Sequence, residues 1–210
     1  MKIISMSLYG TDRLYQSGAI ANARLARVIY PGWSLRIYCD ADIPKPVQVA
    51  LMELGVDLRL LANPGGTYPM FWRFWPAREK NLDALIVRDA DSRLNVREKA
   101  AVDEWLSEGK AFHVMRDHPH HAQWPMLGGM WGVRGGVLPN MVKEIDSWHQ
   151  WWNKLDDMKF LDKRVWPLAR ENMTHHSSVP TKHPNAKPFP KHDPYSGYVG
   201  EIIHCPTPTT

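Results

Sequence analysis

Residues 85–94, LIVRDADSRL, join a short run of β-forming residues to two carboxylates, Asp89 and Asp91. The apolar run, 84–87, predicts a buried strand, and the two acids follow directly after its end. Side chains in an extended segment alternate in direction, so carboxylates two positions apart can point the same way. We therefore expect a polar site at the carboxyl end of this strand.

The rest of the chain alternates between β-rich and helix-like patterns. This alternation predicts an α/β fold in which a mostly parallel central sheet is flanked by helices and ligands bind at the carboxyl ends of the strands. The length of 210 residues suits a single domain over 1–210, with 205–210 as a loose tail. Further strands are expected over 2–8, 35–39, 56–61 and 111–115, and helices over 20–29, 44–54, 70–79, from a cap at Asn95, and around Trp148, Trp151 and Trp152.

Composition excludes several classes of protein. The sequence is 44% hydrophobic and 23% charged, and no segment approaches the roughly 18 consecutive apolar residues of a membrane span. The first residues lack the pattern of a secretory signal, and two cysteines, Cys39 and Cys205, make no disulfide framework, so a cytoplasmic protein is expected. The net charge of +4 is dispersed without a basic block, which favours a small anionic ligand over nucleic acid.

The paired acids allow three interpretations. Close carboxylates repel unless a cation lies between them, and Mg²⁺ or Mn²⁺ with oxygen ligands is the usual resolution. In a purely structural alternative, Asp91 caps the following turn and Asp89 pairs with Arg88 or Arg93. A strand followed by Asp-X-Asp-Ser also resembles the haloacid-dehalogenase class of phosphatases, although that class has the motif on an early strand and at least three strands precede it here.

The ordered set of longer motifs is more specific than Asp-X-Asp alone. Together they resemble small GT-A-type glycosyltransferases, including those of large algal viruses and bacterial surface-glycan pathways. The resemblance implies a GT-A domain that moves a sugar from a nucleotide-sugar donor, with UDP favoured, to a glycan or glycoconjugate acceptor. The motifs are MFWRFWPA at 70–77, VRDADSRLNVREKAAVDEWL at 87–106, FHVMRDHPHH at 112–121 and LGGMWGVRGG at 127–136, with weaker similarity through FLDKRVWPLARENMTHHSS, KPFP and YVGE.

The resemblance also implies a set of metal ligands. Asp91 would bind Mn²⁺ or Mg²⁺ directly, and Asp89 would serve the nucleotide or the metal shell. The family has His-Asp-Ser in a late segment where this chain has His175, His176 and Ser177. His175 is therefore expected as a third metal ligand, while the change to His176 removes the carboxylate of the pattern.

Donor and acceptor residues follow from the same resemblance. Tyr9 and Gly10 would bind the base and ribose, and Arg73 could reach the phosphates unless it forms only a surface salt bridge. Arg88, beside the acids, is included among the donor-binding residues. In the glycine-rich segment, Gly129 would let a ligand approach the backbone, and Trp131 would offer a stacking face or fill the core.

An inverting transferase needs a carboxylate that takes the proton of the acceptor hydroxyl. Asp157 is the first candidate and Asp117 the second, whereas a retaining enzyme would need neither. The match at Asp157 is imperfect, because the family commonly has Asp-Gln where this chain continues with Met158. Two other functions stay open at this point, a phosphohydrolase and a non-catalytic module that binds a nucleotide or a sugar.

Overall fold

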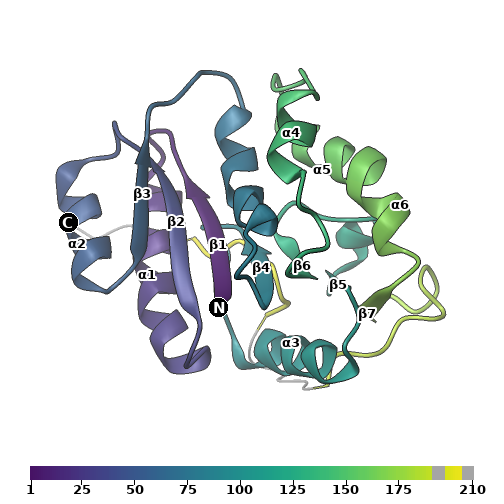
Figure 1. The fold of residues 1–210 in the computed structure, drawn as a ribbon. Coiled ribbons are helices and arrows are strands. Elements are labelled where there is room, and N and C mark those ends of the chain that lie inside the picture. Colours follow the sequence, from purple (N-terminus) through teal and green to yellow (C-terminus); the bar gives the residue numbers. More distant parts are fainter. Residues whose placement is uncertain (191–196, 205–210) are drawn as a thin grey trace.

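The structure, a computed structural model, describes residues 1–190 and 197–204, and these contain a seven-stranded sheet in the order β3-β2-β1-β4-β6-β5-β7 (Figure 1). All neighbouring strands are parallel except β6, which runs antiparallel to β4 and β5. The predicted α/β fold with a mostly parallel sheet is confirmed. The strands are β1 (Lys2–Leu8), β2 (Ser34–Asp40), β3 (Asp57–Leu61), β4 (Ala84–Arg88), β5 (Phe112–Arg116), β6 (Met130–Arg134) and β7 (Met173–Ser177).

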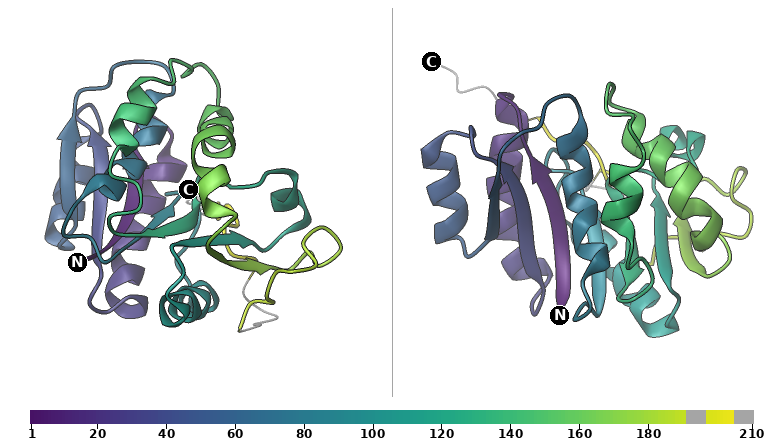
Figure 2. Two further views of the ribbon diagram at one scale, coloured as in Figure 1. Left: turned by 45° about the vertical axis from the view of Figure 1, so that its right-hand side comes forward. Right: turned by 45° about the horizontal axis from the view of Figure 1, so that its top comes forward.

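Helices cover both faces of the sheet because its central strands are apolar on both sides. Along β1, Ile4, Met6 and Leu8 join a core with α1, α2 and α3, whereas Ile3 joins a second core with η1 and α4 to α6. The early helices lie beside β1 to β3 and the later ones beside β5 and β7 (Figures 1 and 2). The helices are α1 (Arg13–Ile29), α2 (Lys45–Glu53), η1 (Tyr68–Arg78), α3 (Val96–Glu108), η2 (Pro119–Gln123), α4 (Met141–Asp146), α5 (Asp156–Phe160), η3 (Leu161–Val165) and α6 (Trp166–Ala169).

Local sequence signals explain where the two longest helices, α1 and α3, begin. The Asp12 side chain accepts a hydrogen bond from the Leu14 N–H at the start of α1. The Asn95 side chain accepts the Glu98 N–H at 2.8 Å, so the predicted cap of α3 is confirmed. The helix predicted over 70–79 is a 3-10 helix that contains Pro76, which has no N–H to donate.

The predicted helix around the three tryptophans is wrong. Helix α4 ends at Asp146, and Trp148, Trp151 and Trp152 lie on the segment that leads to α5. Two features break the helix: His149 has a φ of 55°, and the Trp151 carbonyl accepts the Thr67 N–H at 2.8 Å. Aromatic spacing alone cannot reveal such long-range contacts.

The sheet brings three loops to one edge. The parallel neighbours β1 and β4 end at Leu8 and Arg88, so Tyr9 and Asp89 follow at the same edge. Strand β6 is antiparallel to β4, and the pairing of Arg88 with Met130 delivers the start of β6 to this edge as well. The predicted tail, 205–210, lies outside the described residues. No helix in the described part of the chain is long and apolar enough to span a bilayer.

Candidate functional site

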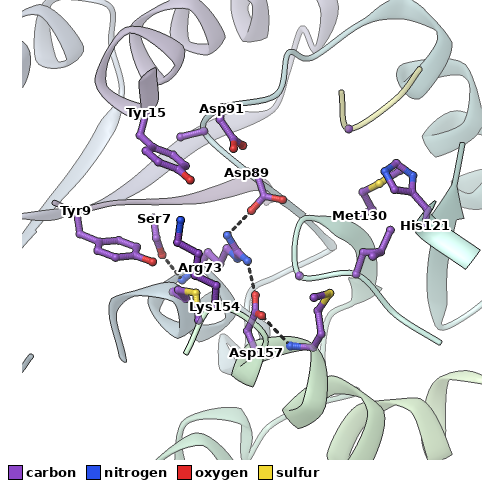
Figure 3. A pocket seen from close by; sticks show the side chains of 16 residues that line it. Ser7, Tyr9, Tyr15, Arg73, Asp89, Asp91, His121, Met130, Lys154 and Asp157 are labelled. Carbon is purple, nitrogen blue, oxygen red and sulfur yellow. Dashed lines mark hydrogen bonds and ion pairs between the residues drawn. The ribbon is translucent and has the colours of Figure 1, made fainter. Parts of the chain in front are cut away.

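A cavity of about 250 Å³ opens at the edge where these three loops meet (Figure 3). Its walls come from the ends of β1 and β4, from α1, η1 and α5, and from the segment before β6. Charged side chains and several methionines line it. The lining residues are Ser7, Tyr9, Tyr15, Met70, Arg73, Asp89, Ala90, Asp91, His121, Leu127, Gly128, Met130, Lys154, Asp157, Met158 and Gly200.

Arg73 lies at the centre of the charged residues of this cavity. Its guanidinium bonds Asp89 through Nη1 at 2.5 Å and Asp157 through Nη2 at 2.6 Å, and Figure 3 shows it between the two acids. Helix η1 places it there, with the Arg73 N–H donating to Ser7 Oγ at 3.1 Å. Burial acts to lower its pKa, but the two carboxylates outweigh burial and raise it. Arg73 is therefore a permanent cation that holds two acids in fixed positions.

Asp89 and Asp91 face different electrostatic environments. Strand alternation directs Arg88 to the α1 and α3 side, where it pairs with Glu98, and directs Asp89 to the opposite side, toward Arg73. Asp91 lines the same cavity, but no lysine or arginine in the described residues forms an ion pair with it. Burial, followed by the charge of Asp89, raises the pKa of Asp91 to about 6. A cation placed here would favour the ionised form of Asp91.

The backbone around these acids is tightly packed. The Asn22 side chain donates to the carbonyls of Ala90 and Ser92, at 3.3 and 2.8 Å. A Cβ at Gly129 would overlap the Asp89 carboxylate, so only glycine fits there. The close approach at Gly129 is therefore to the protein's own Asp89, whereas a ligand was expected there.

Asp157 is the third carboxylate of the cavity. It lies in the first turn of α5, is 3% exposed, and accepts the Met158 N–H at 2.7 Å. Burial, with a contribution from Asp89, raises its pKa despite the opposing charge of Arg73. A Cβ at Gly128 would overlap both the Asp157 carboxylate and the Arg73 guanidinium. A buried carboxylate with a raised pKa is suited to accept a proton.

A second cavity, of about 240 Å³, adjoins the first at the loop after β1. Tyr9 and Tyr15 line both cavities, and Gly10, with a φ of +78°, lines the second. Burial raises the pKa of Tyr9 to about 12, so its hydroxyl is neutral. Tyr9 and Gly10 therefore line a cavity that adjoins the one that contains the acids.

His175 is not brought to this site. It lies on β7, and β6 and β5 separate that strand from β4. Its Nε2 makes a close contact with Arg116 Nη1, and burial, followed by that guanidinium, lowers its pKa to about 3. The expected ligand set of Asp89, Asp91 and His175 does not form, and no group of three or more His, Cys, Asp and Glu side chains in the described residues is arranged to hold a metal.

Three other expected residues also lie away from the cavity. Asp117 accepts hydrogen bonds from Arg97 at 2.8 and 2.9 Å and from the Val199 N–H at 2.9 Å. Burial acts to raise the pKa of Asp117, but these hydrogen bonds outweigh burial and lower it. Arg88 is buried in its ion pair with Glu98, at 2.6 Å. Trp131 is fully buried in the core, with its ring centroid 5.4 Å from that of Phe74. These are structural roles, and of the two alternatives given for Trp131 the structure has the core residue and not the stacking face.

Several lining residues had no clear sequence signal. Lys154 reaches the cavity from the turn before α5, His121 from η2, and Tyr15 from the first turn of α1. Gly128 could have been inferred from the glycine pair at the start of β6. The Ile203 N–H donates to the Asp91 carbonyl at 3.0 Å, so the late segment that approaches the acids is the one around residue 203.

No family model matches the chain, and no curated protein matches it in sequence. Among solved structures it is similar to the mannosyltransferase PcManGT from Pyrobaculum calidifontis in complex with GDP-Man and Mn²⁺, at 10% identity and a TM-score of 0.47, covering 67% of this chain and 46% of that one. It is also similar to TarS 1–349 from S. aureus, at 11% identity and a TM-score of 0.49, covering 77% and 55%. This chain spans about half the length of both, and neither similarity identifies its chemistry.

Proposed function

We propose that the protein is a metal-dependent GT-A-type glycosyltransferase that moves a sugar from a nucleotide-sugar donor, with UDP favoured, to a glycan or glycoconjugate acceptor. The proposal is carried by one juxtaposition: Asp91, a carboxylate that forms no ion pair with any lysine or arginine within 1–190 and 197–204, shares a cavity with Asp89, the Arg73–Asp157 pair and Tyr9. The motifs over 70–136 that resemble such enzymes supply many of the residues of this cavity.

The carboxylate oxygens of Asp89 and Asp91 are suitable ligands for Mn²⁺ or Mg²⁺. Both ions accept one or two carboxylates and complete their coordination with water and substrate phosphates, so a third protein ligand is not required. The raised pKa of Asp91, caused by burial and then by Asp89, is the property expected of a carboxylate that lacks its cation. A bound ion would supply Lewis-acid neutralisation of the leaving diphosphate.

The remaining roles belong to the chain itself. Tyr9 and Gly10 would bind the nucleoside in the adjoining cavity, where the tyrosine ring can stack on the base. In an inverting reaction Asp157 would accept the proton of the acceptor hydroxyl, and Arg73 would fix its orientation. A retaining reaction would use the same donor site without a proton acceptor at Asp157.

Calorimetric titration with UDP, with and without Mn²⁺, tests the proposal. We expect wild-type protein to bind UDP only in the presence of Mn²⁺ and Asp91→Asn to lose this metal-dependent binding. UDP binding that needs neither the metal nor Asp91 would contradict the metal-dependent site.

A screen of UDP-sugars for donor hydrolysis then separates an enzyme from a binding module. Release of UDP from one donor supports the transferase. Metal-dependent UDP binding without turnover of any donor or transfer to any acceptor would indicate the non-catalytic module, and phosphate release from an aryl phosphate would indicate a phosphohydrolase.

A further inference from the structure

The cavity contains more acidic than basic side chains. Asp89, Asp91 and Asp157 line it, against Arg73 and Lys154. Arg73 already bonds two of the acids, at 2.5 and 2.6 Å, and is buried beneath them. Lys154, in contrast, is exposed and has no ion pair or hydrogen bond with any other residue within 1–190 and 197–204. Its ammonium is therefore available to a ligand.

Lys154 lies where the two cavities meet. It lines the cavity of the carboxylates and also the cavity of Tyr9 and Gly10, and Figure 3 shows it beside Arg73 in the same pocket. A ligand that extends from the Tyr9 loop to Asp91 would have its middle portion beside this ammonium. In a nucleotide-sugar, the middle portion is the diphosphate.

The backbone just before Lys154 is held in place. The Trp151 carbonyl accepts the Thr67 N–H at 2.8 Å, and the Asp156 carboxylate accepts the N–H groups of Trp152 and Asn153 at 2.8 and 2.9 Å. Little backbone ordering is then needed when the lysine side chain binds a ligand, which lowers the entropic cost of the contact.

We propose that Lys154 binds the diphosphate of the donor and offsets part of its negative charge when the nucleotide leaves. The inference rests on the proposed function, since it takes a nucleoside diphosphate as the ligand. A diphosphate adds negative charge to a cavity that already holds three carboxylates, and the guanidinium of Arg73 is already paired with two of them. A flexible ammonium is a common phosphate-binding group, and a charge-assisted hydrogen bond is about twice as strong as a neutral one.

Calorimetry with UDP and with uridine, both in the presence of Mn²⁺, tests this role. Lys154→Met keeps the length of the side chain and removes its charge. We expect it to weaken UDP binding about ten-fold and to leave uridine binding unchanged, because only UDP carries the phosphates. Lys154→Arg keeps the charge and should retain most of the affinity for UDP.

Lys163→Met is the matched control, because Lys163 is 70% exposed on η3 and pairs with Asp162 at 3.3 Å, away from both cavities. Equal UDP affinity in wild type and Lys154→Met would overturn the inference while the proposed function stands. An equal loss for uridine and UDP would also overturn it, since Lys154 would then act on the nucleoside or on the fold. If wild type binds no nucleoside diphosphate, the proposed function fails and the inference fails with it.

Discussion

Replacing Asp91 by asparagine should stabilise the metal-free protein at neutral pH while it removes metal-dependent ligand binding. Burial, followed by the charge of Asp89, raises the pKa of Asp91 from 3.8 to about 6. The folded protein therefore holds this proton more tightly than the unfolded chain does. Ionising Asp91 at neutral pH then reduces the free energy of unfolding, and an asparagine avoids that loss.

The size of the effect follows from the pKa difference. At about 1.4 kcal/mol per pKa unit, the difference between 3.8 and about 6 corresponds to a ceiling of about 3 kcal/mol. Asp91 lines a cavity that water can enter, and solvent screening reduces the expected gain to about 1–2 kcal/mol. Below pH 4 the acid is protonated in both states, so the gain vanishes there, grows as the pH rises toward 6, and is constant above that range.

Urea unfolding in the presence of a chelator, at several values between pH 4 and pH 8, measures this gain. The control is Asp103→Asn, which removes an exposed partner of Lys99 on α3 and should change stability by less than about 1 kcal/mol at any of these values. With Mn²⁺ and UDP added, wild type should gain stability and Asp91→Asn should not. A variant that is less stable than wild type at pH 7.5, or a difference that does not vary with pH, would refute the reasoning.

Substitutions at four further positions test other contacts. Arg73→Met leaves the buried Asp157 carboxylate without its cation and should lower the free energy of unfolding at pH 7 by about 3–5 kcal/mol, with a smaller loss near pH 4, as urea titrations at both values would show. Gly128→Ala places a methyl group against Asp157 and Arg73, so donor turnover should fall more than ten-fold, and an unchanged rate would contradict the close packing. Trp131→Ala should destabilise the core by about 3–5 kcal/mol in the same urea assay; Trp131→Phe, which keeps the core filled, should leave UDP affinity unaltered by calorimetry. His175→Gln should retain Mn²⁺-dependent UDP binding within about two-fold, because its Nε2 contacts Arg116 and not the acids; a complete loss would restore it as a ligand.

The architecture could be predicted because its signals are local. Alternating apolar segments predicted the parallel strands, and the parallel pairing of β1 with β4 puts Tyr9 and Asp89, which follow these strands, at one edge. The cap at Asn95 is also local, since its side chain bonds the backbone three residues later. The antiparallel direction of β6 and the end of α4 depend on contacts between distant segments, and the sequence alone did not reveal them.

The same distinction separates the site residues. Asp89 and Asp91 were predictable because both follow a recognisable strand, and Asp157 followed from the family pattern. His175 matched that pattern equally well, but its position depends on the pairing of β7 with β5, which puts it opposite Val114 and beside Arg116. A motif can match in order along the chain while the sheet places its members on strands that are far apart.

The cluster of charged side chains explains why the two residues before β6 are glycines. Two carboxylates and one guanidinium occupy the space between η1, α5 and the loop after β4, and the chain can pass this cluster only where it has no side chains. Gly128 and Gly129 provide that passage, and they precede β6 because the strand enters the sheet antiparallel at this edge. The glycine pair and the ion-pair cluster therefore depend on each other and on the antiparallel direction of β6. A substitution at either glycine or in the cluster should disturb the cavity before it disturbs the sheet.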